Sequence, residues 1–123
     1  MAFAGSEELL AAAEAKLGRR LPELHRARLI RENGGEVRAA RDHWTLYPVW
    51  DPSNRKTMGR TANNILRENE ALRRDWPDVL PDGFIAIADN GGGDLLVLPP
   101  GDDNVRFWDH ETSELSPVKV KWE

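Results

Sequence analysis

The feature of this sequence that most constrains its fold is a glycine triplet between two short apolar runs. Residues 84–88 and 94–98 are almost entirely apolar, and a polar, glycine-rich break separates them (Asn90, Gly91, Gly92 and Gly93). Apolar runs of this length, bounded by Pro, Gly and Asp, are typical of buried β-strands. Because glycine adopts positive φ angles at little cost, the chain can reverse between the two runs. We therefore expect two strands joined by a tight turn.

A third strand is expected after the Pro-Gly-Asp turn cluster that follows. Residues 105–111 read Val-Arg-Phe-Trp-Asp-His-Glu, and alternate side chains of a strand point to opposite faces. Trp108 and His110 would then share one face, with Asp109 on the other. These three strands predict an antiparallel meander, and the alternating residues 115–122 predict one more strand.

Three helices are expected before the glycine-rich turn. Ser6, followed by two acidic residues, is a good N-cap for a helix that runs to about Gly18. A second helix begins at Pro22 and ends at the Asn-Gly-Gly of residues 33–35, a left-handed C-cap signal. A third helix carries an apolar stripe that ends at Trp76, because the residue before a proline avoids the helical region.

Some polar and aromatic residues of the first half have two interpretations. The second helix bears three arginines on its polar side (Arg26, Arg28 and Arg31). They are the type of residue that contacts phosphate, but with Glu23 and Glu32 nearby we favour a solvated face. Residues 36–57 are the hardest to interpret, although residues 44–47 have strand character. Trp50 is expected to pack this loop against the core, and a ligand-binding aromatic is the alternative.

Length and composition favour a single domain spanning residues 1–123. The order of helices and strands predicts an α+β fold, in which a mostly antiparallel sheet of about five strands packs against three helices. The absence of cysteine excludes disulfides and thiolate metal sites. The chain starts without a signal-peptide pattern and has no apolar stretch approaching 18 residues. We therefore expect a cytoplasmic protein with no membrane partner.

The formal net charge of −4 is divided unevenly along the chain. Residues 1–74 hold 14 Lys and Arg against 10 Asp and Glu, whereas residues 75–123 hold 3 against 11. An acidic half disfavours nucleic acid and favours basic partners through electrostatic steering. Turn chemistry by itself also recruits Asp, so the alternative is that these acids only solvate the rim of a sheet.

Several short motifs occur in the order that they have in a known group of proteins. They are Leu21-Pro22, Asn33-Gly34-Gly35, Leu80-Pro81, residues 84–87, residues 90–94 and residues 105–111. With these motifs the chain resembles the SUKH superfamily, which contains bacterial immunity proteins and fungal cell-wall assembly regulators. The resemblance implies a domain that binds and neutralises a cognate toxin, often a nuclease, or one that serves as a scaffold for protein partners.

A toxin-binding role suggests which residues would meet the partner. Nuclease active sites are electropositive, so an acidic surface that covers one competes with nucleic acid. We expect six acids to line the rim of the sheet and to contact such a partner (Asp89, Asp94, Asp102, Asp103, Asp109 and Glu111). Trp50 or Trp108 would anchor the interface, because buried aromatic residues carry much of the binding energy in protein complexes.

An enzymatic role has one candidate site, Asp109-His110-Glu111. On a strand the two acids share a face and His110 opposes them, so the three cannot ligate one metal without a bulge. A metal or acid–base role would need a third acid, with Asp89 or Asp94 as the candidates. The chain has no phosphate-binding loop, EF-hand loop or nucleophile elbow. We therefore assign no catalytic residue, metal or cofactor, and we keep immunity protein, scaffold and small metal-dependent hydrolase as hypotheses. Oligomeric state stays open.

Overall fold

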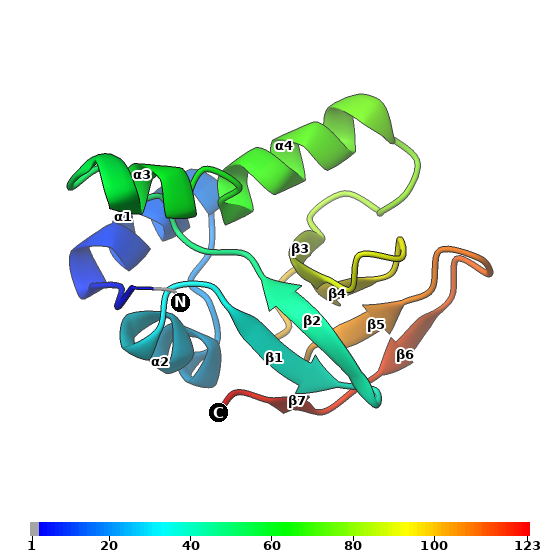
Figure 1. Ribbon diagram of the computed structural model, residues 1–123. Helices are drawn as coiled ribbons and strands as arrows, with labels where there is room; N and C mark the ends of the chain where they lie inside the picture. Colours follow the sequence, from blue (N-terminus) through cyan, green and yellow to red (C-terminus); the bar gives the residue numbers. More distant parts are fainter. Residues whose placement is uncertain (1–2) are drawn as a thin grey trace.

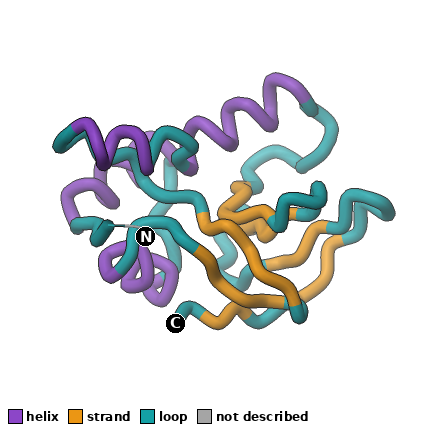
Figure 2. The backbone as a smooth tube through the Cα atoms, viewed as in Figure 1, coloured by secondary structure: helices purple, strands orange, loops and turns teal. Residues whose placement is uncertain are grey.

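The computed structural model describes residues 3–123 and has helices packed on one side of a curled antiparallel sheet (Figures 1 and 2). The helices are α1 Glu7–Leu17, α2 Glu23–Arg31, α3 Arg55–Arg60 and α4 Ile65–Asp75. The strands are β1 Glu36–Ala39, β2 Asp42–Leu46, β3 Ile85–Asp89, β4 Leu95–Leu98, β5 Arg106–Trp108, β6 Leu115–Pro117 and β7 Val120–Lys121. The predicted α+β class is confirmed, with one helix and two strands more than the sequence predicted.

The sheet has the order β6-β5-β4-β3-β2-β1-β7, and every neighbouring pair is antiparallel. The prediction of one strand over residues 115–122 was wrong, because β6 and β7 pair at opposite edges of the sheet. Only Val118 and Lys119 separate these two strands. Three Cα–Cα steps span at most about 11 Å, so the two edges of the sheet must curl toward each other.

Helix ends follow the capping signals in the sequence. The Ser6 hydroxyl accepts a hydrogen bond from the backbone N–H of Leu9 at 3.2 Å, and α1 ends at Gly18 with a φ of 81°. Asn54 and Asn64 cap α3 and α4 in the same way. The short helix α3 was not predicted, since six residues contain too little apolar pattern to indicate a helix.

The core lies between the helices and the central strands. Trp44, Leu46, Ile87 and Leu96 are fully buried. Asn69, which interrupts the apolar stripe of α4, is also buried: its amide donates to the carbonyl of Ala86 and its oxygen accepts from the Ala86 N–H, both at 2.8 Å. This pair of hydrogen bonds attaches α4 to β3.

The prediction that the arginines of the second helix form a solvated face was wrong for two of the three. Arg26 and Arg28 are 4% and 3% exposed, whereas Arg31 is exposed. Arg26 binds Glu7 at 2.6 Å and Glu14 at 3.0 Å on α1. A buried arginine requires such partners, and here they join the first two helices.

Residues 36–57, which are hard to interpret from the sequence, form the β1–β2 hairpin, a loop and the start of α3. β1 and β2 meet at Ala40 and Arg41, which have positive φ angles without being glycine, so the sequence did not indicate this turn. The prediction that Trp50 packs the following loop onto the core was wrong, because Trp50 is 39% exposed. Instead, buried Val49 exchanges two hydrogen bonds with the side chain of Asn33.

Candidate acidic and apolar binding site

The acids predicted to line one rim fall at two different ends of the sheet. In an antiparallel meander, alternate connections lie at the same end of the strands. The β1–β2, β3–β4 and β5–β6 turns therefore share one end, and the β4–β5 connection lies at the other. We call the first the acidic end, after its carboxylates (Asp42, Asp89, Asp94, Asp109 and Glu111). We call the second the Arg19 end, which comprises residues 99–105 and Arg19.

The β3–β4 turn is organised by the side chain of Asn90. Its oxygen accepts hydrogen bonds from the backbone N–H groups of Gly92 at 3.0 Å and Asp94 at 3.2 Å. Its amide donates to Asp42 at 3.2 Å and to Asp94 at 3.0 Å, so one amide holds two carboxylates. Gly93 has a φ of 105°, and a Cβ there would lie 3.0 Å from the His110 ring. Glycine is therefore required at this position.

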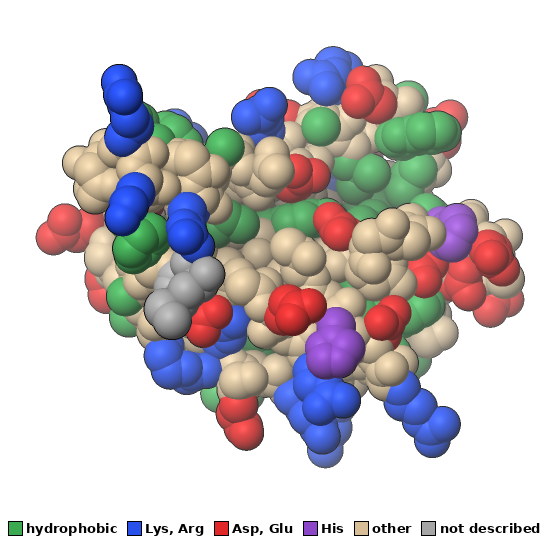
Figure 3. Space-filling model, viewed as in Figure 1, with side chains coloured by type: hydrophobic (Ala, Val, Ile, Leu, Met, Phe, Trp, Pro, Cys, Tyr) green, Lys and Arg blue, Asp and Glu red, His purple; other side chains and the backbone are tan. Residues whose placement is uncertain are grey.

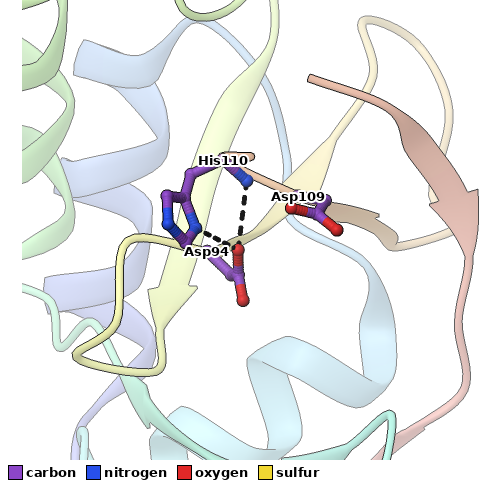
Figure 4. A group of neighbouring side chains, drawn as sticks. All are labelled: Asp94, Asp109 and His110. Carbon is purple, nitrogen blue, oxygen red and sulfur yellow. Dashed lines mark hydrogen bonds and ion pairs between the residues drawn. The ribbon is translucent and has the colours of Figure 1, made fainter. Parts of the chain in front are cut away.

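The β5–β6 turn is hydrogen-bonded to the β3–β4 turn through His110 (Figure 4). Asp94 Oδ1 lies 2.7 Å from His110 Nδ1 and accepts the His110 backbone N–H at 3.0 Å. The expectation that residues 105–111 form one strand was wrong, because β5 ends at Trp108 and His110 lies in the turn. Asp109 accepts the Glu111 N–H at 2.8 Å and lies to one side of the Asp94–His110 pair.

This hydrogen bond shifts the pKa values of His110 and Asp94 in opposite directions. The hydrogen bond to Asp94 raises the pKa of His110 above its usual value. Burial works to raise the pKa of Asp94, but the hydrogen bonds from His110 and Asn90 bring it below its usual value.

Asp94, Asp109 and His110 are also the side chains that could act as ligands of a cation. One potential ligand atom each from Asp94, Asp109 and His110 lies within 4.8 Å of the others. The strand geometry that argued against a joint site is absent, since Asp109 and His110 lie in a turn. However, Asp94 Oδ1 and His110 Nδ1 already satisfy each other. The observed arrangement is thus a hydrogen-bonded link between two turns.

Asp102 and Asp103 lie at the Arg19 end, away from the other predicted acids. Arg19 binds Asp103 at 2.7 Å and donates to the backbone carbonyls of Pro99 and Asp102 at 3.0 and 3.2 Å. The Asp102 carboxylate pairs with Arg106 at 3.4 Å. Both acids are therefore partly neutralised by arginines.

Asp89 faces a cleft bounded by α3, α4, the sheet and residues 33–35. The cleft has a volume of about 510 Å³ and is lined by Tyr47, Arg60, Glu68 and Asp89, among others. The Tyr47 hydroxyl donates to Asp89 at 2.9 Å. Burial, together with the nearby Asp89 carboxylate, raises the pKa of Glu68. Sequence analysis did not identify Glu68, because its neighbourhood with Asp89 depends on the packing of α4 on β3.

Beside the acidic end lies a second, largely apolar cleft of about 620 Å³. It is formed by the end of α4, the loop after it, and the ends of β4 and β5, and Trp76, Val79, Leu95, Trp108 and His110 line it. We call it the Trp76 groove. Trp76, the last residue of the expected apolar stripe, is 65% exposed. Figure 3 shows hydrophobic side chains gathered beneath the end of α4, close to the acidic side chains of the β5–β6 turn.

Helices on a curled antiparallel sheet, with an acidic set of turns beside an apolar groove, define a small α+β domain with a surface suited to binding. A family model described as SMI1 / KNR4 family (SUKH-1) matches residues 4–122, and the chain belongs to this family. A comparison with characterised proteins found no match. Within residues 3–123, none of the helices has the length and apolar character that crossing a bilayer requires.

Proposed function

We propose that this chain is a non-enzymatic protein-binding domain, an immunity protein that neutralises a cognate bacterial toxin by direct binding. The acidic end carries this proposal, because three separate turns bring Asp42, Asp94, Asp109 and Glu111 together. Membership of the SUKH-1 family supports a role in binding a protein partner. The partner is expected to present a basic surface, such as the active site of a nuclease.

The electrostatics favour inhibition by competition. A nuclease must attract phosphates, so its active site is surrounded by Lys and Arg. Carboxylates on a rigid sheet end would occupy this positive surface and speed the encounter of the two proteins. Asp102 and Asp103 are left out of the proposed surface, since Arg19 and Arg106 already pair with them.

The test is co-purification of the tagged chain with the product of the adjacent gene, followed by a nuclease assay and a growth assay on that partner. A stable complex that silences a toxic activity is expected. Neutralising the acidic end in Asp42→Asn/Asp109→Asn/Glu111→Gln should slow association at least tenfold and flatten its dependence on salt. The charge-matched control Glu23→Gln/Asp102→Asn/Asp103→Asn should associate like the wild type. Equal effects of the two variants would contradict the role of the acidic end.

Two other functions give different outcomes. A general scaffold or regulator would bind partners without silencing a toxin from the adjacent gene. A small metal-dependent hydrolase is favoured only by the closeness of Asp94, Asp109 and His110. For that function, titration calorimetry with Mn²⁺ or Zn²⁺ would give a saturable single site that is lost in His110→Gln. We expect no such isotherm.

A further inference from the structure

The Trp76 groove extends beyond its central cleft. One neighbouring hollow shares Leu72, Trp76 and Leu95 with it and continues along α4 toward Tyr47. Another shares Val79 and Trp108 and continues along residues 77–82 to Leu115. The three hollows therefore adjoin one another around Trp76 and Trp108.

The groove has large apolar side chains that remain exposed to solvent. Trp76 is 65% exposed at the end of α4, and Leu115 at the far side is 40% exposed. Trp108 closes the floor at 8% exposed. Large exposed apolar patches on soluble domains mark interaction sites, and tryptophan is among the residues that carry most binding energy.

Acidic side chains outnumber cationic ones around the groove. Glu68, Asp75, Asp78 and Asp82 line it, and no Lys or Arg of the described residues does so in any of the three hollows. Arg74 pairs with Asp75 at 3.0 Å, so the other acids contribute most of the negative charge. His110 stands where the groove meets the acidic end and is bonded to Asp94.

We propose that the Trp76 groove docks a protein segment with a bulky apolar side chain that inserts between Trp76 and Trp108 and with flanking Lys or Arg residues that meet Asp78 and Asp82. The inference rests on the proposed function in taking the partner to be a protein, and it adds an apolar anchor to the acidic end. Charge complementarity argues for a basic partner over a second copy. In a two-fold dimer the same groove would face itself, with acids against acids.

The test begins with selection from a library of random twelve-residue peptides on the immobilised full chain. Selected sequences should converge on an aromatic residue, Leu, Ile or Met flanked by Lys or Arg. Calorimetry with the strongest synthetic peptide should show at least a tenfold weaker affinity for Trp76→Ser, which is expected to fold because the side chain is exposed. The matched controls Met58→Ser and Leu24→Ser remove exposed apolar side chains elsewhere and should bind as the wild type does.

Three outcomes of the peptide experiment would overturn the proposal. They are the absence of a convergent sequence, a convergent sequence without basic residues, and a peptide that binds Trp76→Ser as tightly as the wild type. A concentration-dependent dimer in sedimentation that Trp76→Ser abolishes would assign the groove to a second copy and would also overturn it.

The groove and the immunity function can fail separately. If Trp76→Ser neutralises the adjacent-gene toxin as well as the wild type does, the groove assignment is wrong and immunity stands. If the library returns basic–apolar peptides but the adjacent gene encodes no neutralised toxin, the groove stands and the immunity function is wrong.

Discussion

The two ends of the sheet are both rich in aspartate, yet they use it differently. At the Arg19 end, Asp102 and Asp103 are paired with arginines that also hold the loop backbone. At the acidic end, Asp94 is held by an amide and a histidine, and Glu111 is exposed and forms no ion pair within residues 3–123. The number of acids thus does not determine the electrostatic field of a surface. Pairing decides which carboxylates remain available to a partner.

The turn at the acidic end is expected to depend most on glycine. In Gly93→Ala the backbone would have to keep a φ of 105°, which is strained for alanine. The new methyl group would also lie 3.0 Å from the His110 ring. We expect a loss of about 2–3 kcal/mol in the free energy of unfolding. Gly101→Ala at the Arg19 end has a φ of 70° and no neighbour within 4 Å, so about 1 kcal/mol is expected. Urea denaturation measures both, and equal losses would contradict the contact with His110.

On the Arg19 side, His25 should make the fold sensitive to acid. The side chain is fully buried and stacked on Trp122 at 4.9 Å, and neither ring nitrogen has a hydrogen-bond partner among the described residues. Burial, with Arg19 and Arg28 nearby, lowers the pKa of His25 to about 3. Only the unfolded chain then takes up this proton below its own pKa of about 6.5, so stability falls as the pH drops from there.

Because of His25, the free energy of unfolding is expected to fall by about 1.4 kcal/mol per pH unit below pH 6, or by roughly 2 kcal/mol in total at pH 5. Unfolding by urea at pH 5, 6 and 7 measures it. His25→Phe should remove this part of the slope while keeping the stacked ring. An unchanged slope in His25→Phe would show that the acid sensitivity arises elsewhere.

Removing a cation at the Arg19 end should affect stability more than removing anions at the acidic end. In Arg19→Gln the backbone carbonyls of Pro99 and Asp102 and the Asp103 carboxylate lose their hydrogen-bond donor. We expect the free energy of unfolding to fall by about 1–2 kcal/mol. Asp109→Asn/Glu111→Gln should change stability by less than about 0.5 kcal/mol, because in the part of the chain that the structure describes neither side chain forms an ion pair. Thermal unfolding of the two variants side by side checks the order, and the reverse order would refute the contrast between the ends.

The smallest effect is expected from the ionisation of His110. Its folded pKa is raised by the hydrogen bond to Asp94, so the folded state is stabilised at pH values below about 6.5. This contribution should fade as the pH rises through the folded pKa. An NMR titration of the imidazole should show a raised pKa that returns toward its usual value in Asp94→Asn. An identical titration in both proteins would exclude the link between the two turns.

Local signals in the sequence predicted much of the fold. The cap at Ser6, the left-handed Gly18 and the turn at residues 90–93 lie where the sequence indicates them. Prediction failed where a partner far along the chain decides the outcome. Arg26 is buried because two glutamates of α1 form ion pairs with it. Residues 115–122 form two strands because β6 pairs with β5 and β7 pairs with β1.

The candidate site shows the same division. Asp94 and Asp109 were both predicted to contact a partner, but only the topology brings them together and separates them from Asp102. Trp76 ends the expected apolar stripe of α4 yet is exposed, because helical periodicity does not reveal how far the sheet extends beneath the end of a helix.

The sequence by itself determined the α+β class, the capped helices, the glycine turn and the excess of acid in the second half, since each depends on residues near one another in the chain. The tertiary structure decided which acids are paired, which edge of the sheet each terminal strand joins, and where an apolar groove stays open. These features depend on hydrogen bonds and packing between residues distant in sequence, such as Asp94 with His110 and Arg19 with Asp103.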